Sequence, residues 1–118
     1  MRVVRCCQVA ATDRFDKRYI NSNYGECVDL FAPGVGITSA SNVGVDAYEV
    51  TTGTSLASSV VAGLAAQYLQ MDPLATHYQV KSFLVSNAWP VSVNNAGPRS
   101  PRRLARVAEL FAPSPLEY

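Results

Sequence analysis

Residues 52–63 read Thr-Gly-Thr-Ser-Leu-Ala-Ser-Ser-Val-Val-Ala-Gly, and at this point a polar segment gives way to an apolar, helical pattern. Gly53 has no Cβ, so it allows a sharp backbone turn and a close approach of another segment. Ser55 is expected in the first turn of the helix, among amide donors that have no partner inside the helix. Such donors stabilise developing negative charge, which an acyl-transfer site needs beside its nucleophile. The stretch therefore predicts a reactive serine at position 55.

The helix that follows is predicted from Ser55 to about Met71, because apolar residues recur there with a period near 3.6. Its apolar face is broad, so we expect a helix that is buried on much of its surface. Asp72-Pro73 ends the pattern. Thr76 is the expected N-cap of a second helix that runs to about Asn87.

The remaining segments predict a mixed α/β fold with parallel strands and crossover helices. Their β-branched and small apolar residues indicate strands at residues 3–11, 27–31, 35–40 and 48–52. Polar residues, Gly and Pro predict loops at residues 12–25, 41–47 and 90–101, with a turn at Ala32-Pro33-Gly34. Residues 104–111 are apolar enough to pack as a strand or a short helix.

The segment Gly53-Thr54-Ser55-Leu56-Ala57, followed by Val61-Ala62-Gly63, resembles the nucleophile motif of the subtilisin-like serine proteases. That motif reads G-T-S-M-A-x-P-H-V-A-G in the family. Three upstream segments recur in the same order in the proteinase K-like branch, and the resemblance covers roughly residues 3–107. These segments are VAATDRFD at 9–16, SNYG at 22–25 and VDLFAPG at 28–34. The chain departs from the motif where Leu56 replaces Met, Ser59 replaces Pro and Val60 replaces His.

The resemblance implies an α/β, subtilisin-like parallel sheet with flanking helices, present as its incomplete, C-terminal portion. Residues 1–111 would belong to the peptidase domain and residues 112–118 would form a tail. The family's catalytic residues follow the order Asp, His, oxyanion Asn, Ser, and only the serine falls within this sequence. The chain is therefore expected to be a fragment.

The implied function is a serine endopeptidase that acts on proteins or peptides through an acyl-enzyme at Ser55. The same resemblance makes the Ser55 backbone N–H an oxyanion donor and places Gly53 and Thr54 against the substrate. It also implies a secreted protein that needs no cofactor for catalysis. The N-terminal part of the catalytic domain would be its partner, and the fragment alone is expected to be inactive.

Three other interpretations stay open. Ser55 could merely cap a helix, as serines often do. The chain could be an inert remnant that serves as a binding module, because a truncated sheet exposes strand edges and apolar faces. The order Ser55, Asp72, His77 is that of an α/β-hydrolase, but Ala57 stands where that fold requires glycine. His77, the only histidine, is expected to be a solvated surface residue.

Asp29 matches the position at which proteinase K-like enzymes hold a structural calcium ion. The resemblance implies help from carbonyl groups near Val4 and Cys6. Calcium takes six to eight oxygen ligands, so one carboxylate is a thin basis for a site. The alternative is that Asp29 braces the turn at Ala32-Pro33-Gly34.

Composition limits the remaining function classes. The chain has 118 residues, 48% of them hydrophobic, and a formal charge of +1, which suits one small globular unit without a bias towards nucleic acid or membrane partners. No apolar run is long enough to span a membrane. The arginines near the end are expected in a solvated loop and tail, and Tyr48 and Trp89 as core or loop-packing aromatics. Cys6, Cys7 and Cys27 are expected as buried free thiols, with a bridge, within the chain or to missing polypeptide, as the alternative.

Overall fold

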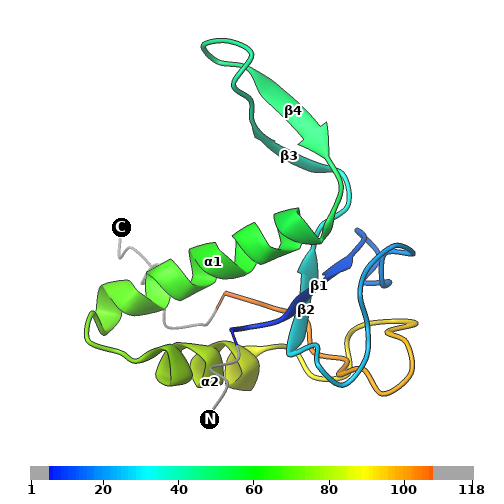
Figure 1. Ribbon diagram of the computed structural model, residues 1–118, viewed down its shortest axis with the longest axis vertical. Coiled ribbons are helices and arrows are strands. Elements are labelled where there is room, and N and C mark those ends of the chain that lie inside the picture. Colours follow the sequence, from blue (N-terminus) through cyan, green and yellow to red (C-terminus); the bar gives the residue numbers. More distant parts are fainter. Residues whose placement is uncertain (1–5, 108–118) are drawn as a thin grey trace, which may run out of the picture.

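The computed structural model describes residues 6–107 of the chain. The elements in order are β1 (Val9–Thr12), β2 (Leu30–Pro33), β3 (Ile37–Ala40), β4 (Tyr48–Thr51), α1 (Thr54–Met71) and α2 (His77–Asn87). Both helices begin within a residue or two of their predicted starts. The α/β class with parallel strands is confirmed, and Figure 1 shows α1 lying across the β1–β2 pair with α2 near its C-terminal end.

β1 and β2 are parallel, with Val9 opposite Leu30 and Thr12 opposite Pro33. The strand predicted at 27–31 thus begins later and continues through Ala32 and Pro33, so the predicted turn there was wrong. Pairing with β1 carries the chain on to Gly34, whose N–H donates to the Thr12 carbonyl at 3.0 Å. A proline fits the last position of β2 because no further ladder N–H is needed from it.

The other edge of β2 is covered by a segment close to the end of the described chain. Phe31 donates to the Arg103 carbonyl at 2.8 Å, and Ala105 donates to the Phe31 carbonyl at 2.7 Å. Leu104 also exchanges hydrogen bonds with Trp89. Leu104 therefore pairs through isolated β-bridges, and neither the strand nor the short helix predicted from residue 104 onward is present up to residue 107. The part beyond residue 107 lies outside the described residues.

β3 and β4 form an antiparallel hairpin that projects from the rest of the molecule (Figure 1). The sequence predicted parallel strands and did not anticipate an antiparallel pair. The connection between these two strands is too short for a crossover, so it allows only an antiparallel return. Both faces of the hairpin are largely exposed, and its apolar side chains Val43, Val45 and Val50 are open to solvent. Tyr48, expected as a packing aromatic, is exposed for the same reason.

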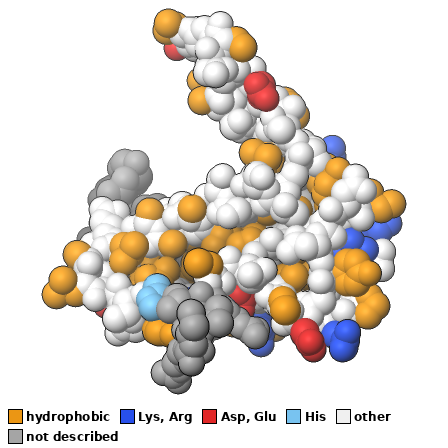
Figure 2. Space-filling view, in the orientation of Figure 1, with side chains coloured by type: hydrophobic (Ala, Val, Ile, Leu, Met, Phe, Trp, Pro, Cys, Tyr) orange, Lys and Arg blue, Asp and Glu red, His pale blue; other side chains and the backbone are white. Residues whose placement is uncertain are grey.

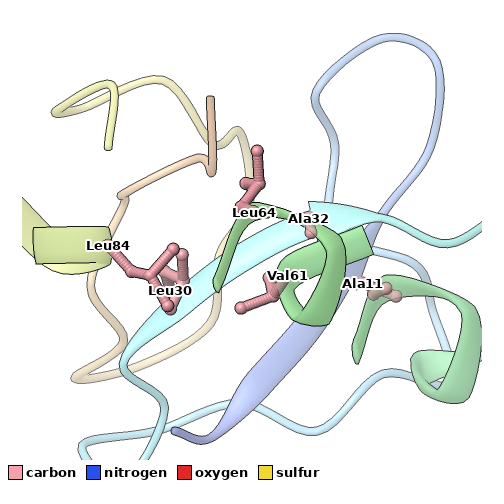
Figure 3. Packing of buried hydrophobic residues seen from close by; sticks show 7 residues of the cluster. Ala11, Leu30, Ala32, Val61, Leu64 and Leu84 are labelled. Atoms are coloured by element: carbon pink, nitrogen blue, oxygen red, sulfur yellow. The ribbon is translucent and has the colours of Figure 1, made fainter. Parts of the chain in front are cut away.

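Two hydrophobic clusters occupy opposite faces of the β1–β2 pair, because successive strand residues point in opposite directions. The cluster towards the helices comprises Ala11, Leu30, Ala32, Ala57, Val61, Leu64 and Leu84 (Figure 3). The cluster on the other face comprises Ala10, Val28, Phe31, Val93 and Ala96.

α2 is held by an N-terminal cap and by a ring contact with α1. Thr76 forms a capping box: its Oγ1 accepts from the Gln79 N–H at 3.4 Å, and the Gln79 side chain accepts from the Thr76 N–H at 2.8 Å. The rings of Tyr68 and Phe83 stack with centroids 4.2 Å apart, which joins α1 to α2. The predicted N-cap is confirmed.

The broad burial predicted for α1 was wrong. Its buried residues are Ala57, Val61 and Leu64, all on one side. Val60, Leu69 and Met71 are exposed, and Figure 2 shows hydrophobic side chains at the surface around both helices. The described elements pack against one side of the helix and leave the other open.

Candidate active site

Ser55 is the second residue of α1, and its side chain is exposed. Leu56 and Ala57 donate their N–H groups to the Gly53 carbonyl at 3.2 and 3.5 Å, which closes the first turn. Within residues 6–107 neither the Ser55 amide nor its hydroxyl has a hydrogen-bond partner, while the Ser55 carbonyl accepts from Ser59 Oγ at 3.0 Å. The amide and the hydroxyl therefore stand together at the positive end of the helix dipole.

The loop before α1 is held by a contact between two glycines. Gly53 donates to the Gly34 carbonyl at 2.8 Å. A Cβ on Gly34 would lie 2.7 Å from both the Ala11 Cβ and the Gly53 carbonyl oxygen, so only glycine fits there. Gly53 itself has extended backbone (φ 162°) and ample space for a Cβ. The close approach predicted for Gly53 is thus present and the chain bends at this residue, but the residue that requires glycine is Gly34.

An open, mainly polar cavity of about 610 Å³ lies beside the serine. Its lining comprises Val9, Asn21, Asn23, Thr54, Ser55 and Ser58. Buried Ser22 fixes the loop that carries the two asparagines, because its Oγ accepts from the Ala11 N–H at 2.8 Å and donates to the Asn23 carbonyl at 3.0 Å. Sequence reasoning named the SNYG segment for its resemblance but did not place it beside Ser55.

His77 is exposed at the first position of α2, and its ring lies 3.9 Å from that of Tyr78. Asp72 caps the C-terminal end of α1, whereas Ser55 is at its start. At 1.5 Å of rise per residue these two ends are about 25 Å apart. A Ser55, Asp72, His77 triad is therefore excluded, and with it the α/β-hydrolase interpretation. The surface position predicted for His77 is confirmed.

Asp29 is held by polar groups from two other segments. Its Oδ2 accepts from the Gln8 N–H at 2.8 Å and lies 2.8 Å from Lys81 Nζ. It does not brace the turn at residues 32–34. Val4, expected to supply a calcium ligand, lies outside the described residues, so the calcium site stays a prediction. Among residues 6–107 no cluster of three or more His, Cys, Asp or Glu side chains could hold a metal ion.

The cysteines form no disulfide within the described part of the chain. Cys6 and Cys27 are exposed rather than buried, so that part of the prediction was wrong. Cys7 is half-buried, and burial, together with the nearby Asp29 carboxylate, raises its pKa from 9.0 to about 11. This thiol is protonated at neutral pH and is a poor candidate for a nucleophile.

The arginines near the end contribute more to structure than a solvated tail would. Arg102 Nε donates to the Val93 carbonyl at 2.8 Å, and Arg106 Nε donates to the Asn87 carbonyl at 2.6 Å. Arg106 also lies over the Trp89 ring, 4.3 Å from its centroid. These side chains are committed to the protein's own carbonyls and ring.

Comparison with known proteins identifies the family of the chain. The sequence profile described as "Subtilase family" matches residues 6–108. The chain belongs to the subtilase family. Its structure superposes on the crystal structure of a cold adapted subtilisin-like serine proteinase with a TM-score of 0.80 and 39% identity, over 86% of this chain and 36% of the other.

Two curated subtilase relatives carry names that describe their activity. The extracellular serine proteinase of Thermus sp. (strain Rt41A) is 48% identical over 103 residues, which are 87% of this chain and 25% of that protein. The alkaline serine exoprotease A of Vibrio alginolyticus is 44% identical over 87 residues, which are 74% of this chain and 16% of that protein. The chain thus spans a quarter or less of the length of these subtilases. No helix within residues 6–107 has the length and apolar character to cross a membrane.

Proposed function

We propose that Ser55 is the nucleophile of a subtilisin-like serine endopeptidase whose other catalytic groups lie outside these 118 residues. The observation that carries the proposal is the exposed serine at the start of α1, beside an open polar cavity and an amide without an acceptor in the described chain. A peptide carbonyl in this cavity would meet both the attacking hydroxyl and a donor for its oxyanion. Gly53 and Thr54 would contact the substrate on the same side.

The reaction needs a base that this chain does not provide. A serine hydroxyl is unreactive unless a neighbouring group takes its proton, and the sole histidine, His77, is the first residue of α2, beyond the end of α1 opposite to Ser55. We propose that a His, oriented by an Asp, comes from the N-terminal part of the catalytic domain, together with an oxyanion Asn. The His would take the Ser55 proton, give it to the leaving amine and then activate the water that hydrolyses the acyl-enzyme.

Protein substrates and an extracellular location follow from the same proposal. Family membership supports protein substrates, and two relatives are named as an extracellular proteinase and an exoprotease. Neither a nucleic acid nor a membrane is an expected partner of a chain with a formal charge of +1.

A second candidate function is that of an inert remnant that binds another polypeptide. The exposed apolar residues of α1 and of the β3–β4 hairpin favour it, because such surfaces pair readily with other chains. Both candidates predict that the chain binds a partner, and they differ in whether Ser55 then reacts.

A fluorophosphonate probe separates the two candidates. The 118-residue chain is incubated with the probe alone and after mixing with the N-terminal part of the catalytic domain of a subtilase, such as the Thermus proteinase. We expect labelling only in the mixture, because loss of the base removes most of the nucleophile's reactivity. Size-exclusion chromatography establishes that the complex forms.

Two serine variants complete the experiment. Ser55→Ala should abolish labelling, whereas Ser58→Ala, which changes a serine lining the same cavity, should leave it intact. A complex that forms without labelling would refute the nucleophile and support the inert binding module.

A further inference from the structure

An ion pair joins three segments of the fold at Asp29. Lys81 Nζ of α2 lies 2.8 Å from Asp29 Oδ2, and the side chains of Lys81 and Asp29 are only 26% and 21% exposed. The same oxygen accepts from the Gln8 N–H at 2.8 Å, just before β1. Asp29 returns this contact, because its own N–H donates to the Gln8 carbonyl at 2.9 Å.

The groups around Asp29 suit an ammonium better than a calcium ion. Calcium requires six to eight oxygen ligands, and residues 6–107 contain no group of three or more His, Cys, Asp or Glu side chains that could hold a metal ion. One oxygen of the Asp29 carboxylate is already engaged by an amide and an ammonium. A divalent cation would have to displace Lys81, whose positive charge would otherwise repel it at close range.

We propose that Lys81 takes the place of a structural calcium ion: its ammonium neutralises Asp29 and ties α2 to the β1–β2 pair, so that this fold does not depend on calcium. The stabilisation that a bound ion gives depends on the logarithm of its free concentration relative to its Kd and vanishes when the ion is removed, whereas a side chain is always present. The inference concerns the stability of the fold and stands whether or not Ser55 is a nucleophile.

The chain offers a matched control in its other described ion pair. Arg99 Nη1 lies 3.9 Å from Glu26 Oε2, and these side chains are 79% and 71% exposed. Solvent screens such a pair, so it contributes little to stability. The Lys81–Asp29 pair differs in its shorter distance, its partial burial and its extra hydrogen bond from Gln8.

Thermal unfolding of the full 118-residue chain tests the role of the ammonium. Lys81→Met keeps the apolar stem and removes the charge, and we expect it to lower the midpoint by about 4–8 °C. Lys81→Arg should restore most of the loss, because it returns a positive charge to the carboxylate. Arg99→Met should change the midpoint by no more than about 2 °C.

Calcium binding is measured on the same proteins. Calcium chloride and a chelator should leave the wild-type midpoint unchanged, and calorimetric titration should detect no calcium site. Acquisition of a calcium site by Lys81→Met would support the proposal further. It is overturned if the wild type binds calcium and Asp29→Asn abolishes that binding, or if Lys81→Met unfolds at the wild-type temperature. If Lys81→Met does not fold, the wild-type titration and Lys81→Arg still decide the matter.

Discussion

The two sides of α1 carry similar residues but have different surroundings. On one side Ala57, Val61 and Leu64 are buried against β1, β2 and α2. On the other side Val60 is exposed, and a Cβ on Gly63 would have no neighbour within 4 Å. An apolar helix therefore does not by itself determine how much of it is buried. The open side agrees with the proposal that a further part of a subtilase domain packs on this helix.

Removal of a large side chain from the packed side should have the largest effect on stability. Leu30 is 0% exposed and contacts the packed side of α1, so Leu30→Ala should lower the free energy of unfolding by about 2–5 kcal/mol. Val60→Ala, on the open side where Val60 is 36% exposed, should cost about 1 kcal/mol or less. Urea denaturation with a common slope measures both. Similar losses for the two variants would show that the open side is packed in solution.

Two glycine substitutions should change the free energy of unfolding in opposite directions on the two sides of α1. In Gly34→Ala the new Cβ meets the Ala11 Cβ and the Gly53 carbonyl at 2.7 Å, and the cost should be about 1–3 kcal/mol. Gly63→Ala adds a methyl to open space within a helix and should stabilise the chain by up to about 1 kcal/mol. The same urea measurements apply to both variants.

Adding the N-terminal part of a subtilase catalytic domain tests the same two glycine variants further. If a further part of the domain covers the open side of α1, its addition should remove the benefit of Gly63→Ala. Gly34→Ala should also impair the probe reaction of Ser55 in the complex, because Gly34 holds the loop that precedes the serine. Destabilisation of the isolated chain by Gly63→Ala would contradict the open side described above.

Local patterns were sufficient to predict both helices, the cap at Thr76 and the strands of the hairpin. They failed where distant segments decide the outcome. Pairing with β1 carries β2 through Pro33, and the short loop between β3 and β4 makes that pair antiparallel. The periodicity of hydrophobic residues within one strand does not show which other strand it pairs with. Both pairings therefore became visible only in the three-dimensional structure.

The candidate site was predictable in part for the same reason. The motif around Ser55 placed a serine at the start of a helix, which is where it lies. The requirement for glycine falls on Gly34 rather than Gly53, because the tight contact is between the two backbones and the missing Cβ is that of Gly34. Asn21 and Asn23 reach the cavity through a loop fixed by Ser22, a long-range contact without a sequence period.

The smallest effect is expected at Cys7, which lines the cavity between α1 and α2 with Val61 and Leu69. Its pKa is raised from 9.0 to about 11 by burial and by the Asp29 carboxylate. The thiolate fraction near pH 8 is then roughly a hundredfold smaller, and the higher intrinsic nucleophilicity of a more basic thiolate recovers about tenfold. A net slowing of about tenfold in the reaction with a disulfide reagent follows.

The exposed thiols of Cys6 and Cys27 are internal standards for this measurement, and single Cys→Ser variants assign each phase. The rate at Cys7 should keep rising with pH beyond 9, towards 11. The folded chain holds this proton more tightly than the unfolded chain, so the stabilisation is present below pH 9 and is lost as the pH rises to about 11. If the three thiols react equally fast, Cys7 is as accessible to solvent as Cys6 and Cys27, and the side of α1 that faces it is less well packed than described here.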